Sequence, residues 1–246
     1  MACFVVTDVE TTGLSTNHDR IVSIAASCRG HEFTEMVNPG RRIPLAATKV
    51  HGITNAAVRN HPCWDVVGAR YWEWLEERRA EADAPTVVLI IHNASFDTRM
   101  LASEMARIHH SELTPIRMEV VDTLRVCRSR LKLLPRHRQA DVYRHLFQEE
   151  APAQHDSLGD VRALARICQH PDIARALDSF RHPLKLLPAP SLLDSVTAPV
   201  SVPVPVSVPV PAAPPAALPL RKPSAHVEVC GACGSRYSRH FKHACA

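Results

Sequence analysis

The sequence predicts an α/β domain in which helices cover a mixed sheet. Three segments with strand character come first, and strand-like segments then alternate with helical ones, an order typical of this class. With 46% hydrophobic and 22% charged residues, the chain has enough apolar material to bury a core. That composition excludes a wholly disordered protein.

Strands are expected where short runs of apolar, β-branched or aromatic residues stand between turn residues. The pair Arg29-Gly30 predicts a hairpin turn, and Asn38-Pro39-Gly40 closes the third run. The expected strands are residues 3–9, 21–27, 32–37, 86–92 and 118–121. The sequence therefore predicts a five-stranded mixed sheet.

Helices are expected where apolar residues recur three and four positions apart. Near the end of the domain, for example, Val161, Leu164, Ala165 and Cys168 follow this spacing. The expected helices are residues 56–59, 64–81, 95–109, 123–132, 139–147 and 157–168.

Charge and proline divide the chain into three parts. Residues 1–182 carry 23 Lys and Arg against 23 Asp and Glu, so the excess of +4 lies beyond them. Twelve of the 20 prolines lie in residues 183–223. We therefore expect a globular domain at 1–182, a Pro-rich linker at 183–224 and a small module at 225–246.

Composition also bears on where the protein works. No apolar run is long enough to span a membrane, and Met1 to Glu10 has no basic segment typical of a secretory signal. Eight cysteines in a chain that is not secreted favour reduced thiols or metal ligands over disulfides. We expect a protein of the cytoplasm or nucleus, with no membrane partner. Five cysteines lie in apolar elements and are expected in the core: Cys3, Cys28, Cys63, Cys127 and Cys168.

The Pro-rich segment alternates Pro, Val and Ser from Pro199 to Pro211. Proline cannot donate to a sheet or sit within a helix, so this segment favours disorder or extended polyproline II. It is expected to act as a semi-rigid spacer. The alternative is a docking site for a Pro-binding partner.

Acidic residues close the first strand. Side chains alternate along a strand, so Asp8 and Glu10 lie on the same side. Two carboxylates about 4 Å apart at an effective dielectric of about 20 cost about 4 kcal/mol. A cation would remove that cost, and oxygen ligands suit Mg²⁺ or Mn²⁺. The alternative is a strand end that turns into solvent.

Two further acidic motifs stand at predicted helix starts. His92 to Asp97 joins an apolar strand to a helix that Ser95 can cap, which puts Asp97 in the first turn. His155 to Asp160 opens the last helix, with Ser157 as N-cap and Asp160 as its capping-box partner. Each motif alone could be an ordinary capped helix.

Taken in order, the three motifs resemble the DEDDh, or DnaQ-like, 3′–5′ exonuclease family of the ribonuclease H-like superfamily. Its pattern is D-x-E, then H-N-x-x-F-D, then H-x(4)-D, and no member of the set is missing. The resemblance spans roughly residues 1–180. Supporting fragments include residues 11–14, 51–54, 122–124 and 159–164.

The resemblance implies a metal-dependent exonuclease. Two Mg²⁺ or Mn²⁺ ions would neutralise charge on both the attacking water and the leaving 3′-oxygen. It implies that Asp8 bridges both ions and that Glu10, Asp97 and Asp160 complete the set. It makes His155 the candidate general base, since the unperturbed pKa of histidine, about 6.5, suits proton abstraction near neutral pH.

The resemblance also implies contacts to the substrate, a nucleic-acid 3′ end. Leu14 and Ile53 match positions that stack or wedge against terminal nucleotides, and apolar contact of that kind tolerates any base. Asn93, Thr11 and Thr12 match positions that touch the terminal nucleotide. For Leu14 and Ile53, ordinary loop packing is the alternative.

A second cluster of metal-binding residues lies in the tail. Cys230, Cys233, His240 and Cys245 follow the spacing C-x2-C-x6-H-x4-C, which resembles a small CCHC zinc module. His243 is an alternative ligand. Such a short tail would take its folding energy from one structural Zn²⁺. Its basic residues could bind nucleic acid or a protein partner, and an incidental cluster in a disordered terminus is the alternative.

The sequence favours a 3′–5′ exonuclease acting on single-stranded DNA. An exoribonuclease of the same fold is the alternative substrate class, because room for a 2′-hydroxyl is not visible in a sequence. A non-catalytic adaptor that recruits partners through the linker and tail is the alternative class of function. Proofreading, which would need a polymerase partner, is not distinguished from repair or clearance of nucleic acid, and the oligomeric state is open.

Overall fold

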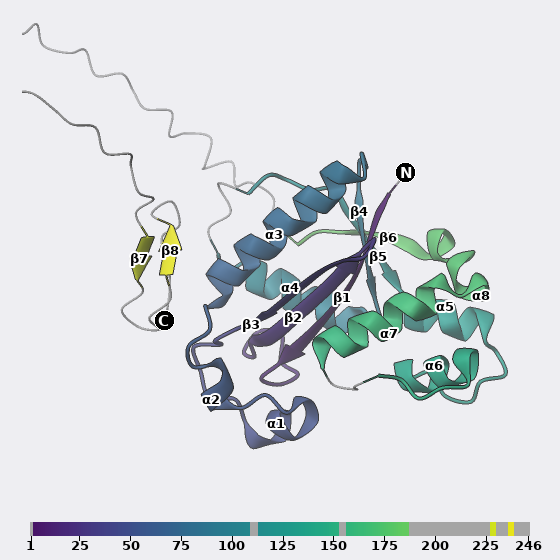
Figure 1. Ribbon diagram of the computed structural model, residues 1–246, viewed down its shortest axis with the longest axis horizontal. Coiled ribbons are helices and arrows are strands. Elements are labelled where there is room, and N and C mark those ends of the chain that lie inside the picture. The colour runs from purple at the N-terminus through teal and green to yellow at the C-terminus, as the bar shows by residue number, and fades with distance from the viewer. Residues whose placement is uncertain (1, 109–112, 153–155, 187–226, 230–235, 239–246) are drawn as a thin grey trace, which may run out of the picture.

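The computed structural model describes residues 2–108, 113–152, 156–186, 227–229 and 236–238. Within that part, one six-stranded sheet forms the centre of the domain, and helices pack on both of its faces (Figure 1). The order of strands across the sheet is β3-β2-β1-β4-β5-β6. Their bounds are β1 Cys3–Thr11, β2 Ile21–Cys28, β3 His31–Met36, β4 Val87–Ile91, β5 Met118–Asp122 and β6 Arg181–Leu184.

Pairing is mixed, as the sequence predicts. β1, β4 and β5 are parallel, whereas β2, β3 and β6 are each antiparallel to their neighbours. The β2–β3 hairpin turns at Arg29-Gly30, where both residues have positive φ, as a tight primed turn requires. β4 is buried along its whole length, which explains its uninterrupted apolar sequence.

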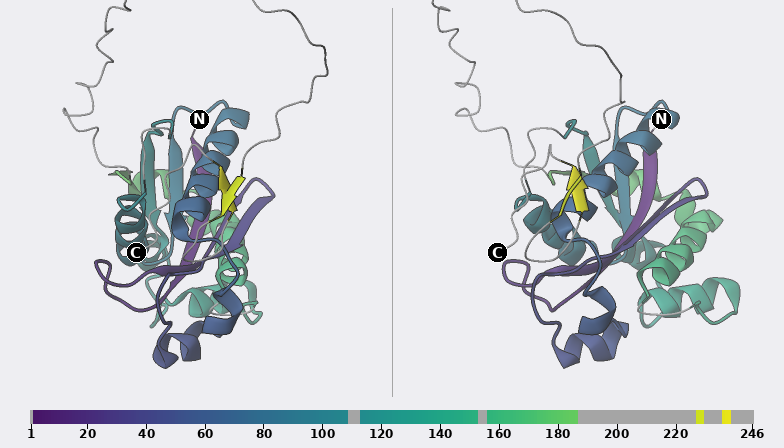
Figure 2. Two further views of the ribbon diagram at one scale, coloured as in Figure 1. Left: turned by 90° about the vertical axis from the view of Figure 1, so that its left-hand side faces the viewer. Right: turned by 60° about the vertical axis from the view of Figure 1, so that its left-hand side comes forward.

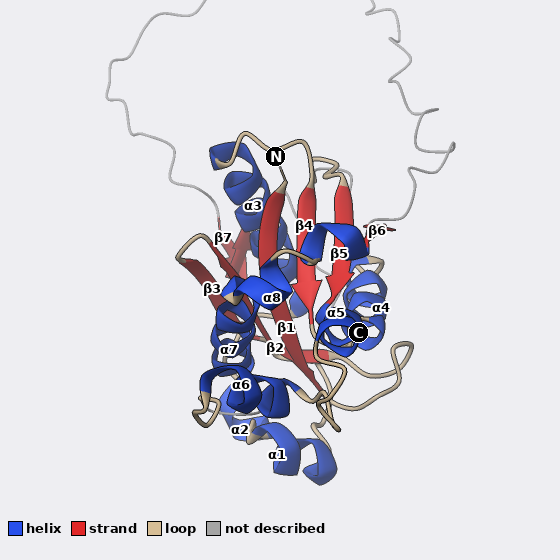
Figure 3. Cartoon of the chain, turned by 90° about the vertical axis from the view of Figure 1, so that its right-hand side faces the viewer, coloured by secondary structure: helices blue, strands red, loops and turns tan. Residues whose placement is uncertain are grey.

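Helices form a layer on each side of this sheet, and the turned views separate the two layers (Figures 2 and 3). α3 and α4 contribute to one apolar core, and α5, α6 and α7 to the other. The helices are α1 Leu45–His51, α2 Asn55–Val58, α3 Trp64–Glu81, α4 Ser95–Met105, α5 Thr123–Arg130, α6 Gln139–Phe147, α7 Ser157–Gln169 and α8 Pro171–Ala174, with a short 3₁₀ helix at Leu177–Phe180.

The prediction of five strands is wrong by one. β6 pairs with β5, and its sequence Arg-His-Pro-Leu has neither alternation nor an apolar run. Pro183 is tolerated because β6 has only one neighbour, β5, in the described sheet. Helix α1 was also not expected, because none of its residues is buried and its sequence therefore carries no apolar stripe.

Two predicted helix caps are wrong. Ser95 is the first residue of α4 rather than its cap; Ala94 holds the N-cap position and makes no side-chain cap bond. The cap of α7 is Asp156, whose side chain accepts from the Gly159 N–H at 3.1 Å. Ser157 instead lies buried, and its hydroxyl is 2.7 Å from that of Ser23 on β2. Asp156 is therefore the N-cap of α7, the position that the sequence pattern predicted for Ser157.

The core prediction for cysteine is confirmed, because the five cysteines expected there are all buried and free. Only two short strands of the tail are described, β7 Val227–Val229 and β8 Arg236–Ser238, which form an antiparallel pair. The predicted zinc ligands Cys230, Cys233, His240, His243 and Cys245 lie outside the described residues, as does most of the Pro-rich segment.

Candidate active site

The site begins where β1 runs past the end of its parallel neighbour. The pairing of β1 with β4 ends at Val6, opposite Ile90, whereas its pairing with β2 continues to Thr11. The second half of β1 therefore has a strand on one side only. Asp8 and Glu10 lie in this half. The pairing with β2 holds their backbone in place, and no strand of the described sheet occupies the other side of β1 next to them.

Asp97 occupies the side that β4 leaves open. It lies in the first turn of α4, and its carboxylate accepts hydrogen bonds from its own N–H and from the N–H of Val9. The side chain is only 7% exposed. Asp97 is thus fixed against β1, next to the strand residues that carry the other acids.

Asp160 comes from the opposite layer. It lies in the first turn of α7, a helix that packs against β1 and β2. The contact between Ser157 and Ser23 fixes the start of this helix on β2. Gln139 on α6 donates from Nε2 to the backbone oxygen of Asp160 at 2.8 Å and to its Oδ1 at 3.3 Å. The start of α7 is therefore held both by β2, through Ser23, and by α6, through Gln139, and the Asp160 carboxylate lies beside β1.

Three of the four predicted acids meet closely. One oxygen from each of Asp8, Glu10 and Asp160 lies within 4.8 Å of the others, the spacing of ligands around one cation. Asp97 is not part of that set, although its charge is the largest of those acting on Asp8. All four donors are carboxylates, the ligands that Mg²⁺ and Mn²⁺ prefer, so the residues fit a divalent ion.

The electrostatics of the site show how unfavourable it is without a cation. Burial raises the pKa of Asp8 well above its usual range, and the charges of Asp97, Glu10 and Asp160 raise it further. Burial, with repulsion from Asp160 and Asp97, also raises the pKa of Glu10 to about 8. Burial raises the pKa of Asp97 to about 7, against the lowering effect of its two backbone hydrogen bonds. Without a cation, the raised pKa values favour the neutral, protonated forms of Asp8, Glu10 and Asp97.

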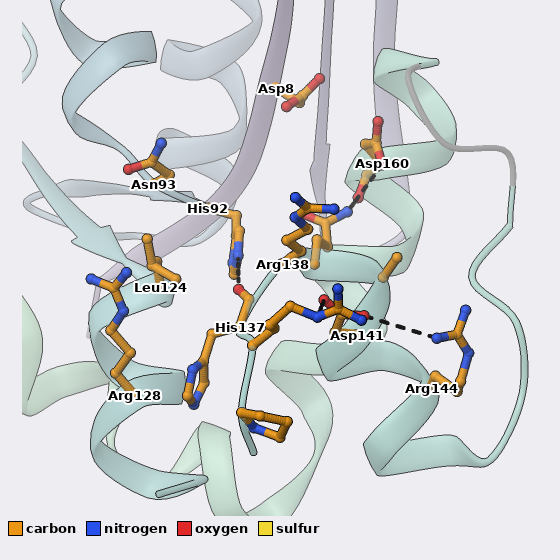
Figure 4. A pocket seen from close by; sticks show the side chains of 14 residues that line it. Asp8, His92, Asn93, Leu124, Arg128, His137, Arg138, Asp141, Arg144 and Asp160 are labelled. Carbon is orange, nitrogen blue, oxygen red and sulfur yellow. Dashed lines mark hydrogen bonds and ion pairs between the residues drawn. The ribbon is translucent and has the colours of Figure 1, made fainter.

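A cavity of about 890 Å³ opens from this cluster (Figure 4). Asp8 and Asp160 lie at one end, and Arg128, His137 and Arg144 lie at the other. The cavity is thus acidic at the cluster and basic away from it. It can accept an anionic ligand whose one end is placed among bound cations.

The end of β1 and the loop that follows it carry three of the predicted substrate residues. Thr11 and Thr12 are buried, and their hydroxyls donate to the Gly13 carbonyl at 2.8 Å and to Asp19 Oδ1 at 2.8 Å. Their side chains therefore brace the loop. Leu14 is 84% exposed, which rules out the alternative that it is packed within the described protein.

Ile53 and Asn93 lie at other edges of the site. Ile53 packs partly against the small cluster of Val22, Ile43 and Val58, so loop packing accounts for part of its role. Asn93 is exposed, lines the cavity and has φ of 65°, a conformation that asparagine adopts more readily than most residues.

An ion-pair network that the sequence reasoning missed holds the β1–β2 loop to α4. Glu104 is fully buried and accepts from Arg20 Nε at 2.7 Å and from the N–H of Ile21 at 3.1 Å. Arg107 lies 3.4 Å from the same carboxylate and donates to the backbone oxygen of Asn17 at 2.9 Å. Because Glu104 is on the helix that carries Asp97, one helix positions both Asp97 and the β1–β2 loop. A buried Glu within an apolar helix face was the only signal.

A second missed group lies at the end of β4. His92 Nδ1 is 3.0 Å from the Thr123 hydroxyl, and its Nε2 is 2.8 Å from the backbone oxygen of His137. Burial lowers the pKa of His92, so the neutral ring predominates at neutral pH. Asp122 caps α5 and also accepts from the N–H of Asn93 at 3.0 Å. These contacts fix the strand ends that surround the cavity.

The candidate general base His155 lies outside the described residues. Its neighbours on the helical side, Asp156 and Asp160, are described and place the start of α7 beside the cluster. Among the described helices, none is both long and apolar enough to cross a membrane.

Comparison with known proteins agrees with the geometry. The model of a protein family described as exonuclease matches residues 5–168. A DNA polymerase III subunit epsilon-like protein of Rhodobacter capsulatus is 37% identical over 172 residues, which are 66% of this chain and 22% of that protein. The DNA polymerase III subunit epsilon of Rickettsia felis is 27% identical over 171 residues, 66% of this chain and 71% of that protein.

Two other similarities cover different shares of the proteins concerned. A PolC-type DNA polymerase III of Streptococcus pneumoniae is 33% identical over 141 residues, 55% of this chain but 9% of that protein. A solved structure of exonuclease X in complex with 5′-overhanging duplex DNA aligns with a TM-score of 0.49 and 24% identity, covering 72% of this chain and 96% of that one.

Proposed function

This chain belongs to the DnaQ-like exonuclease family, and from that premise we propose that it hydrolyses phosphodiester bonds from the 3′ end of nucleic acid, with single-stranded DNA favoured. The observation that carries the proposal is the meeting of Asp8, Glu10 and Asp160 within 4.8 Å, with Asp97 beside them. A structural role does not account for a cluster in which the charges of Asp97, Glu10 and Asp160 all raise the pKa of Asp8. A divalent-cation site does.

The chain's own residues have separate tasks in this proposal. Two Mg²⁺ or Mn²⁺ ions would be held by Asp8, Glu10, Asp97 and Asp160. Once bound, they would stabilise the negative charge on the attacking oxygen and on the leaving 3′-oxygen. His155, which precedes α7 by two residues in the sequence, would take the proton of the attacking water. Leu14 and Ile53 would contact the terminal bases, and Thr11, Thr12 and Asn93 would line the place of the terminal nucleotide.

The DNA preference is supported by the relatives, which are named as DNA polymerase III subunits. Those names also support a polymerase as a partner, and hence an intracellular location and a role in proofreading. We further propose that Cys230, Cys233, His240 and Cys245 bind one structural Zn²⁺, with His243 as the alternative ligand. Zinc content of the purified full chain, measured beside a Cys230→Ser variant, tests this part separately.

The deciding experiment is digestion of 3′- and 5′-labelled single-stranded DNA, duplex DNA and RNA in the presence of Mg²⁺. The 5′ label should yield a ladder that shortens from the 3′ end, and the 3′ label should be released at once as mononucleotide. Asp8→Asn should bind DNA and leave it intact. Faster digestion of RNA than of DNA would make the chain an exoribonuclease, and undiminished turnover by Asp8→Asn would refute the active site.

A further inference from the structure

Four arginines line the cavity, and two of them are already paired. Arg144 donates to both oxygens of Glu150, at 2.8 and 2.6 Å, and Arg136 lies 3.8 Å from Asp141. Within the part of the chain that the structure describes, the side chains of Arg128 and Arg138 make no hydrogen bond or ion pair. Of these two, Arg138 lies between His92 and Asp160 in Figure 4, nearer the carboxylates.

The backbone at Arg138 is fixed on both sides. The residue before it, His137, offers its carbonyl oxygen to His92 at 2.8 Å and places its own Nε2 3.0 Å from the Leu131 oxygen. The residue after it, Gln139, is tied to Asp160 by two hydrogen bonds. The Arg138 side chain is exposed, but its backbone belongs to a segment that is anchored beside Asp160, so the guanidinium starts from a fixed point near the carboxylates.

Arg138 also stands at the start of a helix. It is the N-cap residue of α6, its side chain makes no capping hydrogen bond, and Gln139 and Ala140 of the first turn line the same cavity. The positive end of the helix and the guanidinium therefore act on the same space. Both favour an oxyanion, and the planar guanidinium suits a phosphate in particular.

We propose that Arg138 binds the second phosphate from the 3′ end of the substrate strand. This inference rests on the proposed function. A strand that ends in a 3′-hydroxyl has its last phosphate at the scissile bond, so any further phosphate must lie on the 5′ side. With the scissile phosphate at the carboxylates, the phosphate at Arg138 is the one that remains with the shortened strand. Arg138 would therefore keep hold of the strand while the mononucleotide leaves.

The test compares three small DNA substrates with wild-type protein. A dinucleotide without a 5′-phosphate has only the scissile phosphate, whereas a trinucleotide or a 5′-phosphorylated dinucleotide has a second one. We expect kcat/KM to be about tenfold higher for the latter two, the usual effect of a charge-assisted hydrogen bond. Arg138→Gln should remove most of that ratio, and Arg70→Gln, a control outside the cavity lining whose guanidinium is paired with Glu35, should keep it.

A binding measurement is independent of turnover. In the Asp8→Asn background, Arg138→Gln should lower the salt dependence of single-stranded DNA binding by about one phosphate contact, a change in logarithmic slope of about 0.7. An unchanged slope, or an equal loss of turnover on all three substrates, would overturn the proposal. If the wild-type protein digests no nucleic acid while the slope still changes, the proposed function fails and the phosphate site stands.

Discussion

The metal-free protein should lose stability as pH rises from about 4.5 to about 8, and Glu10→Gln should remove part of that loss. The folded protein holds the pKa of Glu10 at about 8, against 4.5 when it is unperturbed. Below pH 4.5 both the folded and unfolded states are protonated, so the group costs nothing. Above it the unfolded chain releases its proton first, which favours unfolding until the pH passes about 8.

The magnitude follows from that interval. At pH 7 the side chain of Glu10 is ionised in the unfolded chain but still mainly protonated in the folded protein. Each pH unit between 4.5 and 7 therefore lowers the free energy of unfolding by about 1.4 kcal/mol. The cost to the folded state is therefore about 3 kcal/mol at pH 7. For a domain of this size, that corresponds to a Tm about 6–12 °C higher in Glu10→Gln than in the wild type.

Thermal unfolding followed by circular dichroism in EDTA, at pH 4.5 and pH 7, measures this difference. Wild type and Glu10→Gln should unfold at similar temperatures at pH 4.5 and separate at pH 7. Saturating Mn²⁺ should then stabilise the wild type more than the variant, because binding to the folded state alone raises stability. Glu73→Gln, on the exposed face of α3, is the control. A Glu10→Gln effect that is the same at both pH values would refute the electrostatic account.

Three further outcomes are expected. Glu104→Gln should raise KM for single-stranded DNA severalfold with a smaller change in kcat, because the ion pair between Arg20 of the β1–β2 loop and Glu104 of α4 is lost. An effect on kcat alone would contradict this role. Gly68→Ala should lower the free energy of unfolding by about 1–3 kcal/mol in urea titrations, because the added Cβ would lie 2.8 Å from Nε1 of buried Trp64. A more stable variant would show that the higher helix propensity of alanine outweighs this clash. His155→Ala should slow single-turnover hydrolysis strongly and spare DNA affinity, so a loss confined to affinity would count against a general base.

The sequence predicted the elements that carry strong periodicity. α3 and α6 begin and end where expected, and the first five strands differ from their expected bounds by at most two residues at either end. Apolar spacing encodes such elements directly, because burial of one face both shapes the sequence and stabilises the element. β6 and α1 escaped prediction because neither has a buried apolar stripe, and only their tertiary neighbours hold them in place.

The acids of the site could be found in the sequence, whereas their supports could not. Asp8, Glu10, Asp97 and Asp160 stand in recognisable motifs because each must sit at a strand end or a helix start. Residues such as Glu104 and Gln139 act through partners more than 20 positions away, as with Arg20 and Asp160. No local pattern reports such a contact, and it becomes visible only when the chain is folded.

The order in which the acids occur along the chain has a consequence for synthesis of the protein. Asp8 and Glu10 leave the ribosome first, Asp97 follows with α4, and Asp160 comes only with α7, the last long helix of the domain. α7 must dock on β1 and β2 before its carboxylate can join the cluster. A nascent chain or a fragment that ends before α7 therefore lacks a complete metal site. Under the proposed function, such an unfinished chain would not digest nearby nucleic acid during translation.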